Sequence, residues 1–294
     1  MITPFKSDGS IDFETCGQLV EWYIQSGLAG IFAVCQSSEM FFLKREERLE
    51  LADFVIKKAA GRISVAVSGH VSETAQMQAE ELCQMAALEP DAVVLVSNRL
   101  ITDGEENFIS NCQALIEELP KNVPLGMYEC PFPKKRLLTQ EDIIFLNKTG
   151  RFSFVKDTCC DIEKMRARAK LISDDFMFFN ANSATLLESM KAGFSGYCGV
   201  MANFHPHLYA WLCSHTEDKR AYLISRMLGV MSVIEARDYP VCAKRYLNNQ
   251  LGFPISELSR SKQACFVPAI DQELEGIKVL TNYADSLIRG GIKA

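Results

Sequence analysis

The stretch Phe152-Ser-Phe-Val-Lys156 is a short apolar run that ends in a lysine. A second run, Pro124-Leu-Gly-Met-Tyr128, lies about one β-α unit earlier and ends in a tyrosine. Both runs are nearly continuous in apolar residues, which is typical of parallel strands covered on both faces. They therefore predict two neighbouring parallel strands of an α/β fold.

Five further runs have the same apolar character and extend this pattern along most of the chain. These predicted strands cover residues 29–34, 63–68, 92–96, 176–180 and 196–200. Residues 1–3 have the composition of an incomplete first strand, so we expect part of that strand to precede this numbering.

Helical stretches lie between the predicted strands. One begins with Asp12 as its N-cap and ends at Gly27, and another begins with Thr139 and Asp142, a pair typical of a capping box. Eight β-α units in under about 250 residues, counting the incomplete one, predict a TIM (β/α)8 barrel. An open doubly wound sheet is the alternative, but no GxGxxG motif follows an early strand.

The pattern changes after Asn203, where only helices are predicted, at residues 216–237, 241–249 and 271–290. No linker rich in Pro, Gly or Ser precedes them. We therefore expect residues 1–203 to form the barrel, and residues 204–294 to form C-terminal helices that complete the barrel and pack on it.

The composition is that of an ordinary globular protein, with 48% hydrophobic and 23% charged residues among 294. A net charge of −6 argues against a general binder of nucleic acid or anionic membranes. The 11 cysteines form no repeated CxxC pairs and lie mostly in apolar runs, so a disulfide framework is not expected. Without a signal peptide or a long apolar run, we expect a cytoplasmic protein.

Lys156 and Tyr128 are the strongest candidates for chemistry, because the C-terminal ends of barrel strands form one rim where reacting groups gather. Low dielectric disfavours the charged form of a buried lysine, and a neutral amine is a nucleophile towards ketones. A phenol nearby can carry protons for it. The alternatives are a lysine that extends its ammonium into water and a core tyrosine bonded to a backbone carbonyl.

Five short segments carry a resemblance that covers most of the chain. They are Thr3-Pro-Phe with Asp8-Gly-Ser-Ile-Asp12, Cys35-Gln-Ser-Ser-Glu39, Tyr128-Glu-Cys-Pro131, Phe154-Val-Lys-Asp-Thr158, and Gly193-Phe-Ser-Gly196 with Ala202-Asn203. In their order and spacing these segments resemble the dihydrodipicolinate synthase / N-acetylneuraminate lyase superfamily of class I aldolases.

The resemblance implies a mechanism and a set of site residues. Lys156 would form an imine with pyruvate or another 2-oxo acid, Tyr128 would shuttle protons, and no metal or organic cofactor would be needed. Small-molecule 2-oxo acids would be the only ligands, and the assembly would be a homotetramer, a dimer of dimers. The resemblance places Ser37 and Ser38 at the substrate carboxylate, and Thr158 matches a feature of the lyases. From their positions in the predicted strands, and not from the resemblance, we expect Asn180 to bind sugar-type hydroxyls and Cys198 to line the floor of the pocket.

The chain also departs from the family pattern at several positions. Gln36 stands where the carboxylate loop usually has Thr or Ser, and Cys35 and Ser38 replace two glycines. No tyrosine lies between Tyr23 and Tyr128 to complete the proton relay of the synthases, and their arginine after the Tyr-Asn-x-Pro motif is Pro133. The Asp-Glu pair and the serine of neuraminate lyases are Ser183-Ala184 and Val200.

These departures favour a lyase that releases pyruvate from a 2-oxo-3-deoxy sugar acid or a similar 2-oxo acid. Three alternatives stay open: a dehydratase on a sugar acid using the same imine, a dihydrodipicolinate synthase-like condensation, and a catalytically impaired 2-oxo-acid-binding protein.

Several other polar residues have structural interpretations. We expect Arg99 to be a solvated or subunit-contact arginine, His70 to be structural, and Glu129 to point away from the site towards a neighbour. We also expect Lys134-Lys135-Arg136 to form a solvated loop and Cys159-Cys160 to pack within a helix.

Overall fold

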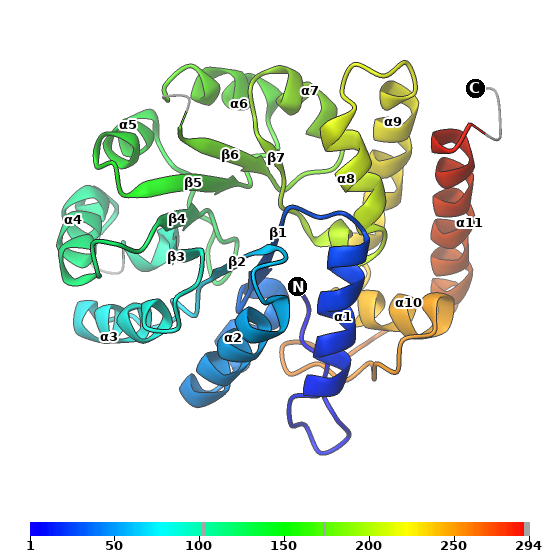
Figure 1. The fold of residues 1–294 in the computed structure, drawn as a ribbon, viewed down its shortest axis with the longest axis horizontal. Helices are drawn as coiled ribbons and strands as arrows, with labels where there is room; N and C mark the ends of the chain where they lie inside the picture. The colour runs from blue at the N-terminus through cyan, green and yellow to red at the C-terminus, as the bar shows by residue number, and fades with distance from the viewer. Residues whose placement is uncertain (102–103, 173–174, 291–294) are drawn as a thin grey trace.

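The computed structural model describes residues 1–101, 104–172 and 175–290, and its centre is a single curled parallel sheet (Figure 1). The strands follow one another in sequence order around the sheet, each parallel to the next. They are β1 (Gly30–Ala33), β2 (Ser64–Val67), β3 (Ala92–Val96), β4 (Leu125–Tyr128), β5 (Phe152–Asp157), β6 (Met177–Asn180) and β7 (Gly196–Tyr197). The TIM-barrel prediction is confirmed.

The pairing of β4 with β5 sets the position of the two candidate catalytic residues. Tyr128 and Lys156 are partners in its register, so both lie at the same height on the rim. Gly126 of β4 makes this close pairing possible, since a Cβ there would lie 2.4 Å from the ring of Phe154. Sequence and register thus agree that the two strand ends meet.

The two ends of the sheet differ from the prediction. Residues 1–3 form no strand, although the Met1 amino group donates a hydrogen bond to the Phe32 carbonyl (2.7 Å) and the side chains of this segment are buried. The predicted last strand continued to Val200, but the chain leaves the sheet after Tyr197. Val200 instead begins the 3-10 helix η5 (Val200–Asn203).

In the described chain, helices lie around the sheet, one before β1 and one after each strand (Figure 1). They are α1 (Phe13–Gln25), α2 (Arg45–Ala59), α3 (Ala75–Ala86), α4 (Phe108–Glu118), α5 (Gln140–Lys148), α6 (Ile162–Ala169), α7 (Leu186–Lys191) and α8 (Pro206–Ser214). Asp12 caps α1 as predicted, through a bond from the Thr15 amide. The sequence analysis missed α8, whose start is marked only by Pro206 in its first turn.

Helices α9 (Ala221–Met231), α10 (Val241–Leu251) and α11 (Ile270–Ile288) follow the barrel. The prediction of one helix over residues 216–237 was too long, because α9 gives way to the 3-10 helix η6 (Ser232–Ala236). Helices α8, α9 and α11 pack together on the side of the barrel away from α4 (Figure 1). Residues 291–294 of the predicted C-terminal part lie outside the described residues.

The capping box at α5 provides a test of local stability. The Asp142 amide donates to the Thr139 hydroxyl (3.1 Å), and the Thr139 amide donates to the Asp142 carboxylate (2.8 Å). Thr139→Ala should therefore lower the free energy of unfolding by about 1 kcal/mol, measured in urea. Thr139→Ser keeps the hydroxyl and should stay near the parent; an equal loss in both variants would contradict this assignment.

Candidate active site

Lys156 lies at the end of β5 with its side chain only 6% exposed. Its Nζ is 4.4 Å from the ring centroid of Tyr128 and 5.4 Å from that of Phe32. In the parts of the chain that the structure describes, no hydrogen bond or ion pair engages this Nζ. The amine is therefore held against two aromatic faces and kept largely out of water, as the sequence analysis required.

Tyr128 is buried beside the lysine, and its phenol donates a hydrogen bond to Gln36 Oε1 (3.3 Å). Cys130 Sγ donates to the same oxygen at 3.5 Å. Burial raises the pKa of the Tyr128 phenol well above its usual value, and the nearby thiols of Cys130, Cys35 and Cys198 add to this. The phenol thus stays protonated and can act as a proton donor. Gln36, a departure from the family pattern, holds its orientation.

The candidate carboxylate loop is the 3-10 helix η1 (Gln36–Ser38). The Ser38 hydroxyl donates to the Met1 carbonyl (2.8 Å) and accepts from the Cys35 amide (3.2 Å), so it fastens the loop to the N-terminus. Both bonds are internal and Ser38 is fully buried, so its hydroxyl supports the loop. Its contact with a substrate carboxylate stays a prediction. Ser37 is also buried and stays a candidate.

Cys35 begins this loop and lies next to the lysine. Burial raises the pKa of its thiol, but the positive charges of the N-terminus and Lys156 and a bond with Ser38 outweigh burial and lower the value to about 7. The same charges that act on Cys35 would attract the carboxylate of a small acid. The loop therefore lies close to two positive charges, those of the N-terminus and Lys156.

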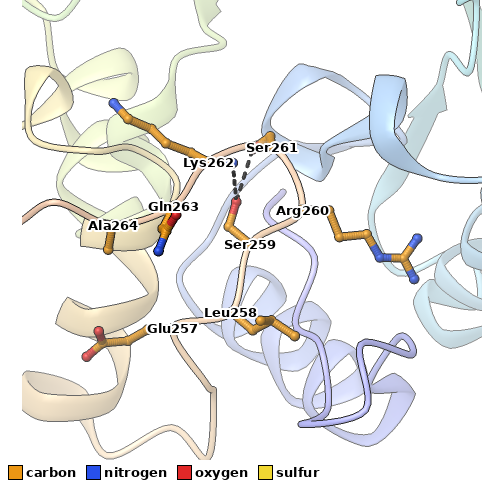
Figure 2. Close-up of a pocket in the computed structure, with 8 residues that line it drawn as sticks. All are labelled: Glu257, Leu258, Ser259, Arg260, Ser261, Lys262, Gln263 and Ala264. Carbon is orange, nitrogen blue, oxygen red and sulfur yellow. Dashed lines mark hydrogen bonds between the residues drawn. The ribbon is translucent and has the colours of Figure 1, made fainter.

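Glu39 anchors the far end of the loop to a C-terminal segment, residues 257–264, drawn in Figure 2. Its carboxylate accepts from Lys244 Nζ (2.9 Å), the Ser259 hydroxyl (2.8 Å) and the backbone amides of Arg260 and Ser261 (2.7 and 2.8 Å). Figure 2 shows the segment bent around Ser259, whose hydroxyl also accepts from the Lys262 amide (3.1 Å). Glu39 therefore holds loop structure, as expected.

A buried ion cluster involves the two residues that directly follow Tyr128 and Lys156. Arg168 of α6 pairs with Glu129, which follows Tyr128, and with Asp157, which follows Lys156. Glu129 also accepts bonds from the backbone amides of Leu138 (2.7 Å) and Thr158 (2.8 Å). The prediction that Glu129 points to a neighbour is confirmed, and the neighbour is an arginine.

Asn180 and Thr158, two residues expected to contact substrate, form hydrogen bonds with other protein groups. The Asn180 amide donates to the hydroxyls of Thr185 (3.0 Å) and Ser189 (2.9 Å), its oxygen accepts from the Asn182 amide (2.7 Å), and the residue is fully buried. The Thr158 hydroxyl donates to the Glu129 carbonyl at 2.9 Å. The polar atoms of Asn180 and the hydroxyl of Thr158 therefore bond to other protein groups, and their contacts with substrate stay predictions. Cys198, half-buried and close to Tyr128, stays a candidate.

Glu235 is a residue that the sequence analysis missed. It lies on η6, and its carboxyl group interacts electrostatically with Lys156. Burial raises the pKa of this carboxyl to about 7, although the positive lysine opposes the shift. Its only sequence signal was an acid inside a predicted helix, which normally indicates a solvated face.

His70 is structural as expected, since its ring nitrogen Nδ1 accepts from the Val96 amide (2.9 Å). Arg99 is buried against the ring of Phe41 and is not solvated, and its expected place at a subunit contact stays a prediction. Lys134 and Lys135 are exposed as expected, but Arg136 is buried over the ring of Phe108. In both arginines an aromatic face stabilises the guanidinium out of water.

Cys159 and Cys160 do not pack within a helix. They lie in the loop between β5 and α6, and Cys160 is exposed. Within the described ranges, no helix is long and apolar enough to cross a membrane, and no three His, Cys, Asp or Glu side chains gather as a metal site.

Comparisons with known proteins agree with this geometry. The model of the dihydrodipicolinate synthetase family matches residues 1–266. The chain is 28% identical to the 4-hydroxy-tetrahydrodipicolinate synthase of Laribacter hongkongensis over 213 residues, which cover 72% of each protein. It is 23% identical to the enzyme of that name from Oceanobacillus iheyensis over 97% of this chain and 96% of the relative.

Solved structures show the same fold. Dihydrodipicolinate synthase from Aquifex aeolicus superposes with a TM-score of 0.83 at 20% identity, over 96% of each chain. YagE from E. coli K12, a prophage protein of the dihydrodipicolinic acid synthase family solved in complex with pyruvate, gives a TM-score of 0.83 at 18% identity over 97% of this chain and 96% of that one.

Proposed function

We propose a function from one premise, which is that this chain belongs to the dihydrodipicolinate synthetase family, whose members are lyases of the class I aldolase type. Within that family, the proposed reaction is the cleavage or formation of a C–C bond in a 2-oxo acid. The direction favoured here releases pyruvate from a 2-oxo-3-deoxy sugar acid or a similar compound.

The observation that carries the proposal is the setting of Lys156. An amine that is 6% exposed, lies against the rings of Tyr128 and Phe32 and has no carboxylate bonded to it in the described structure is placed to act as a nucleophile towards the carbonyl group of a bound 2-oxo acid. Solvated surface lysines have none of these features.

The proposed chemistry proceeds through an imine. Lys156 Nζ attacks the C2 carbonyl carbon, and Tyr128 protonates the oxygen, which leaves as water. The protonated imine draws electrons from the C3–C4 bond when a proton is removed from the 4-hydroxyl group. An aldehyde leaves, the resulting enamine takes a proton at C3, and water releases pyruvate from Lys156.

Borohydride reduction with pyruvate tests the proposal directly. The protein should gain the mass of one reduced pyruvyl group, and peptide mapping should place it on Lys156. A folded protein that gains no mass would remove the imine mechanism. Turnover on 2-oxo-3-deoxy acids then separates a catalyst from a protein that only binds.

Two other reactions through the same imine remain as alternatives, and product analysis in the turnover assay distinguishes them. The names of the relatives favour a condensation of pyruvate with an aldehyde, as in 4-hydroxy-tetrahydrodipicolinate synthases. Against it, this chain has no tyrosine between Tyr23 and Tyr128 and has Pro133 where those synthases place an arginine. Loss of water from a sugar acid, detected as a 2,5-dioxo or related product, would instead identify a dehydratase.

Tyr128→Phe should lower kcat by at least about a hundredfold, because the proposed proton donor is a phenol whose ring centroid lies 4.4 Å from Lys156 Nζ. The imine should still be trapped by borohydride, only more slowly, since the nucleophile is intact. Steady-state turnover and the rate of adduct formation measure the two effects. A variant with parental kcat would exclude proton transfer by Tyr128.

A homotetramer, built as a dimer of dimers, is the proposed assembly. Apolar side chains on α9, η6 and α11 point into solvent in the single chain, namely Tyr222, Val230, Val233, Val279 and Tyr283. Such a face is typical of a subunit contact. Light scattering measures the mass. All 11 cysteines are free, which supports the expected cytoplasmic location.

A further inference from the structure

The candidate carboxylate loop is flanked by two residues with an unusual backbone conformation. Val34, which precedes Cys35, has a φ angle of 48°, and Glu39, which ends η1, has a φ angle of 61°. Residues other than glycine rarely adopt this left-handed conformation, and it persists only where the surrounding structure holds it. The contacts of Glu39 therefore help to set the path of the loop.

A buried ion pair holds Glu39. Lys244 of α10 and Glu39 are both buried, and Lys244 Nζ donates to Glu39 Oε1 (2.9 Å) and to the Leu258 carbonyl (2.5 Å). Glu39 Oε2 accepts from the Ser259 hydroxyl, which lies at the bend of the C-terminal segment, and from two backbone amides of that segment (Figure 2). One side chain of the loop thus carries its attachment to groups 205 to 222 residues away in the sequence.

A continuous series of contacts joins this ion pair to the candidate catalytic residues. The Glu39 amide donates to the Gln36 carbonyl (2.9 Å), so the two residues are linked directly within the loop. The side-chain oxygen of Gln36 accepts from the Tyr128 phenol (3.3 Å), and the ring of Tyr128 lies 4.4 Å from Lys156 Nζ. A displacement of Glu39 would therefore move the group that holds the phenol.

We propose that Lys244 and Ser259 are positioning residues, which fix Glu39 so that Gln36 holds the Tyr128 phenol in place for proton transfer at Lys156. The inference rests on the proposed function, because it needs an imine at Lys156. It gives α10 and the C-terminal segment a part in catalysis that requires no contact with the substrate.

A positioning role differs from a purely structural role in its dependence on the phenol. If the ion pair acts through Gln36 and Tyr128, its loss slows the reaction only while the phenol is present. If the ion pair only stabilises the fold, its loss lowers stability but leaves the rate of the folded protein unchanged. A double-mutant cycle between the ion pair and the phenol measures this dependence.

The cycle consists of the parent, Lys244→Met, Tyr128→Phe and the double variant. Each protein is mixed with saturating pyruvate and quenched with borohydride at timed intervals. Mass spectrometry then gives the rate constant for adduct formation on Lys156. Circular dichroism gives the folded fraction, to which each rate is normalised.

Lys244→Met should slow adduct formation about tenfold in the parent, because a small misplacement of a catalytic group costs one to two orders of magnitude in rate. In the Tyr128→Phe background the same substitution should change the rate by less than about twofold, the usual error of additivity. Lys57→Met is the matched control. It removes a lysine from an exposed pair with Asp53 on α2 (2.7 Å) and should keep the parental rate.

Ser259→Ala provides a second test, since Lys244→Met leaves the Glu39 charge buried without its partner and can prevent folding. It removes one neutral donor to Glu39 and should slow adduct formation about threefold, the scale of one hydrogen bond, again only when the phenol is present. Ser259→Thr keeps the hydroxyl and should restore the parental rate.

Two results would overturn the inference. If the folded Lys244→Met and Ser259→Ala variants keep the parental rate, or are slowed equally with and without the phenol, these residues do not act through Tyr128, while the imine proposal stands. If the folded parent forms no adduct with pyruvate, the proposed function fails and the inference fails with it.

Discussion

Lys156→Arg is expected to abolish the reduced pyruvyl adduct and to lower turnover by about 10⁴-fold or more, the scale of losing a covalent nucleophile. Arginine keeps the length and charge of the side chain, but its guanidinium stays protonated and cannot attack a carbonyl. Intact-protein mass after borohydride reduction and steady-state kinetics measure the two effects.

Lys135→Arg is the matched control for this experiment. Lys135 also lies at the barrel mouth, but its Nζ is bonded to the Thr158 carbonyl rather than free against aromatic rings. The control should retain the adduct. A persisting adduct in Lys156→Arg, or its loss in Lys135→Arg, would assign the nucleophile to a different residue.

The strands and the pair of strand-end residues could be predicted from the sequence because they depend on local pattern. The continuous apolar runs predicted seven strands, and for six of them the predicted last residue lies within one residue of the observed strand end. The order of strands in a barrel then places Lys156 beside Tyr128 without further information. The cap residues Asp12 and Thr139 were also predictable, because capping involves only neighbours in the sequence.

The roles of other site residues depended on partners distant in the sequence. Ser38 is fastened to Met1, and Asn180 is saturated by Thr185 and Ser189, but neither choice of partner is visible in a motif. A serine or asparagine at a strand end looks the same whether its polar atoms face a ligand or the protein. The structure alone distinguishes these cases.

Glu235 and Arg136 show the same limit for charged residues. A run of charges or an acid on a helix normally indicates a solvated face. On that basis Arg136 was assigned to a solvated loop, and Glu235 was not identified. Arg136 is buried because its guanidinium lies 3.8 Å from the ring centroid of Phe108 and pairs with Asp142 (2.8 Å). Glu235 is drawn inward because η6 folds back on the barrel, which no local pattern predicts.

Arg168→Met should lower the free energy of unfolding by about 3–5 kcal/mol, the scale of removing one partner from a buried ion cluster. The substitution leaves Glu129 and Asp157 fully buried and without their counter-charge. Urea unfolding measures the loss. Arg166→Met on the same helix is the control, since Arg166 is half exposed and pairs with Glu163 in solvent, and it should change stability by less than about 1 kcal/mol.

The pH dependence separates lost charge from lost packing in Arg168→Met. Burial already raises the pKa of Glu129, and Arg168 opposes that shift, so its removal should raise the pKa further. A carboxyl whose pKa is higher in the folded state destabilises the fold when ionised, and protonation relieves this as the pH falls. The deficit relative to the parent should therefore shrink at lower pH. A deficit that is constant with pH would mean that Arg168 contributes packing alone. The yield of the reduced pyruvyl adduct in Arg168→Met measures whether the substitution also disturbs Tyr128 and Lys156, because Glu129 and Asp157 directly follow these two residues.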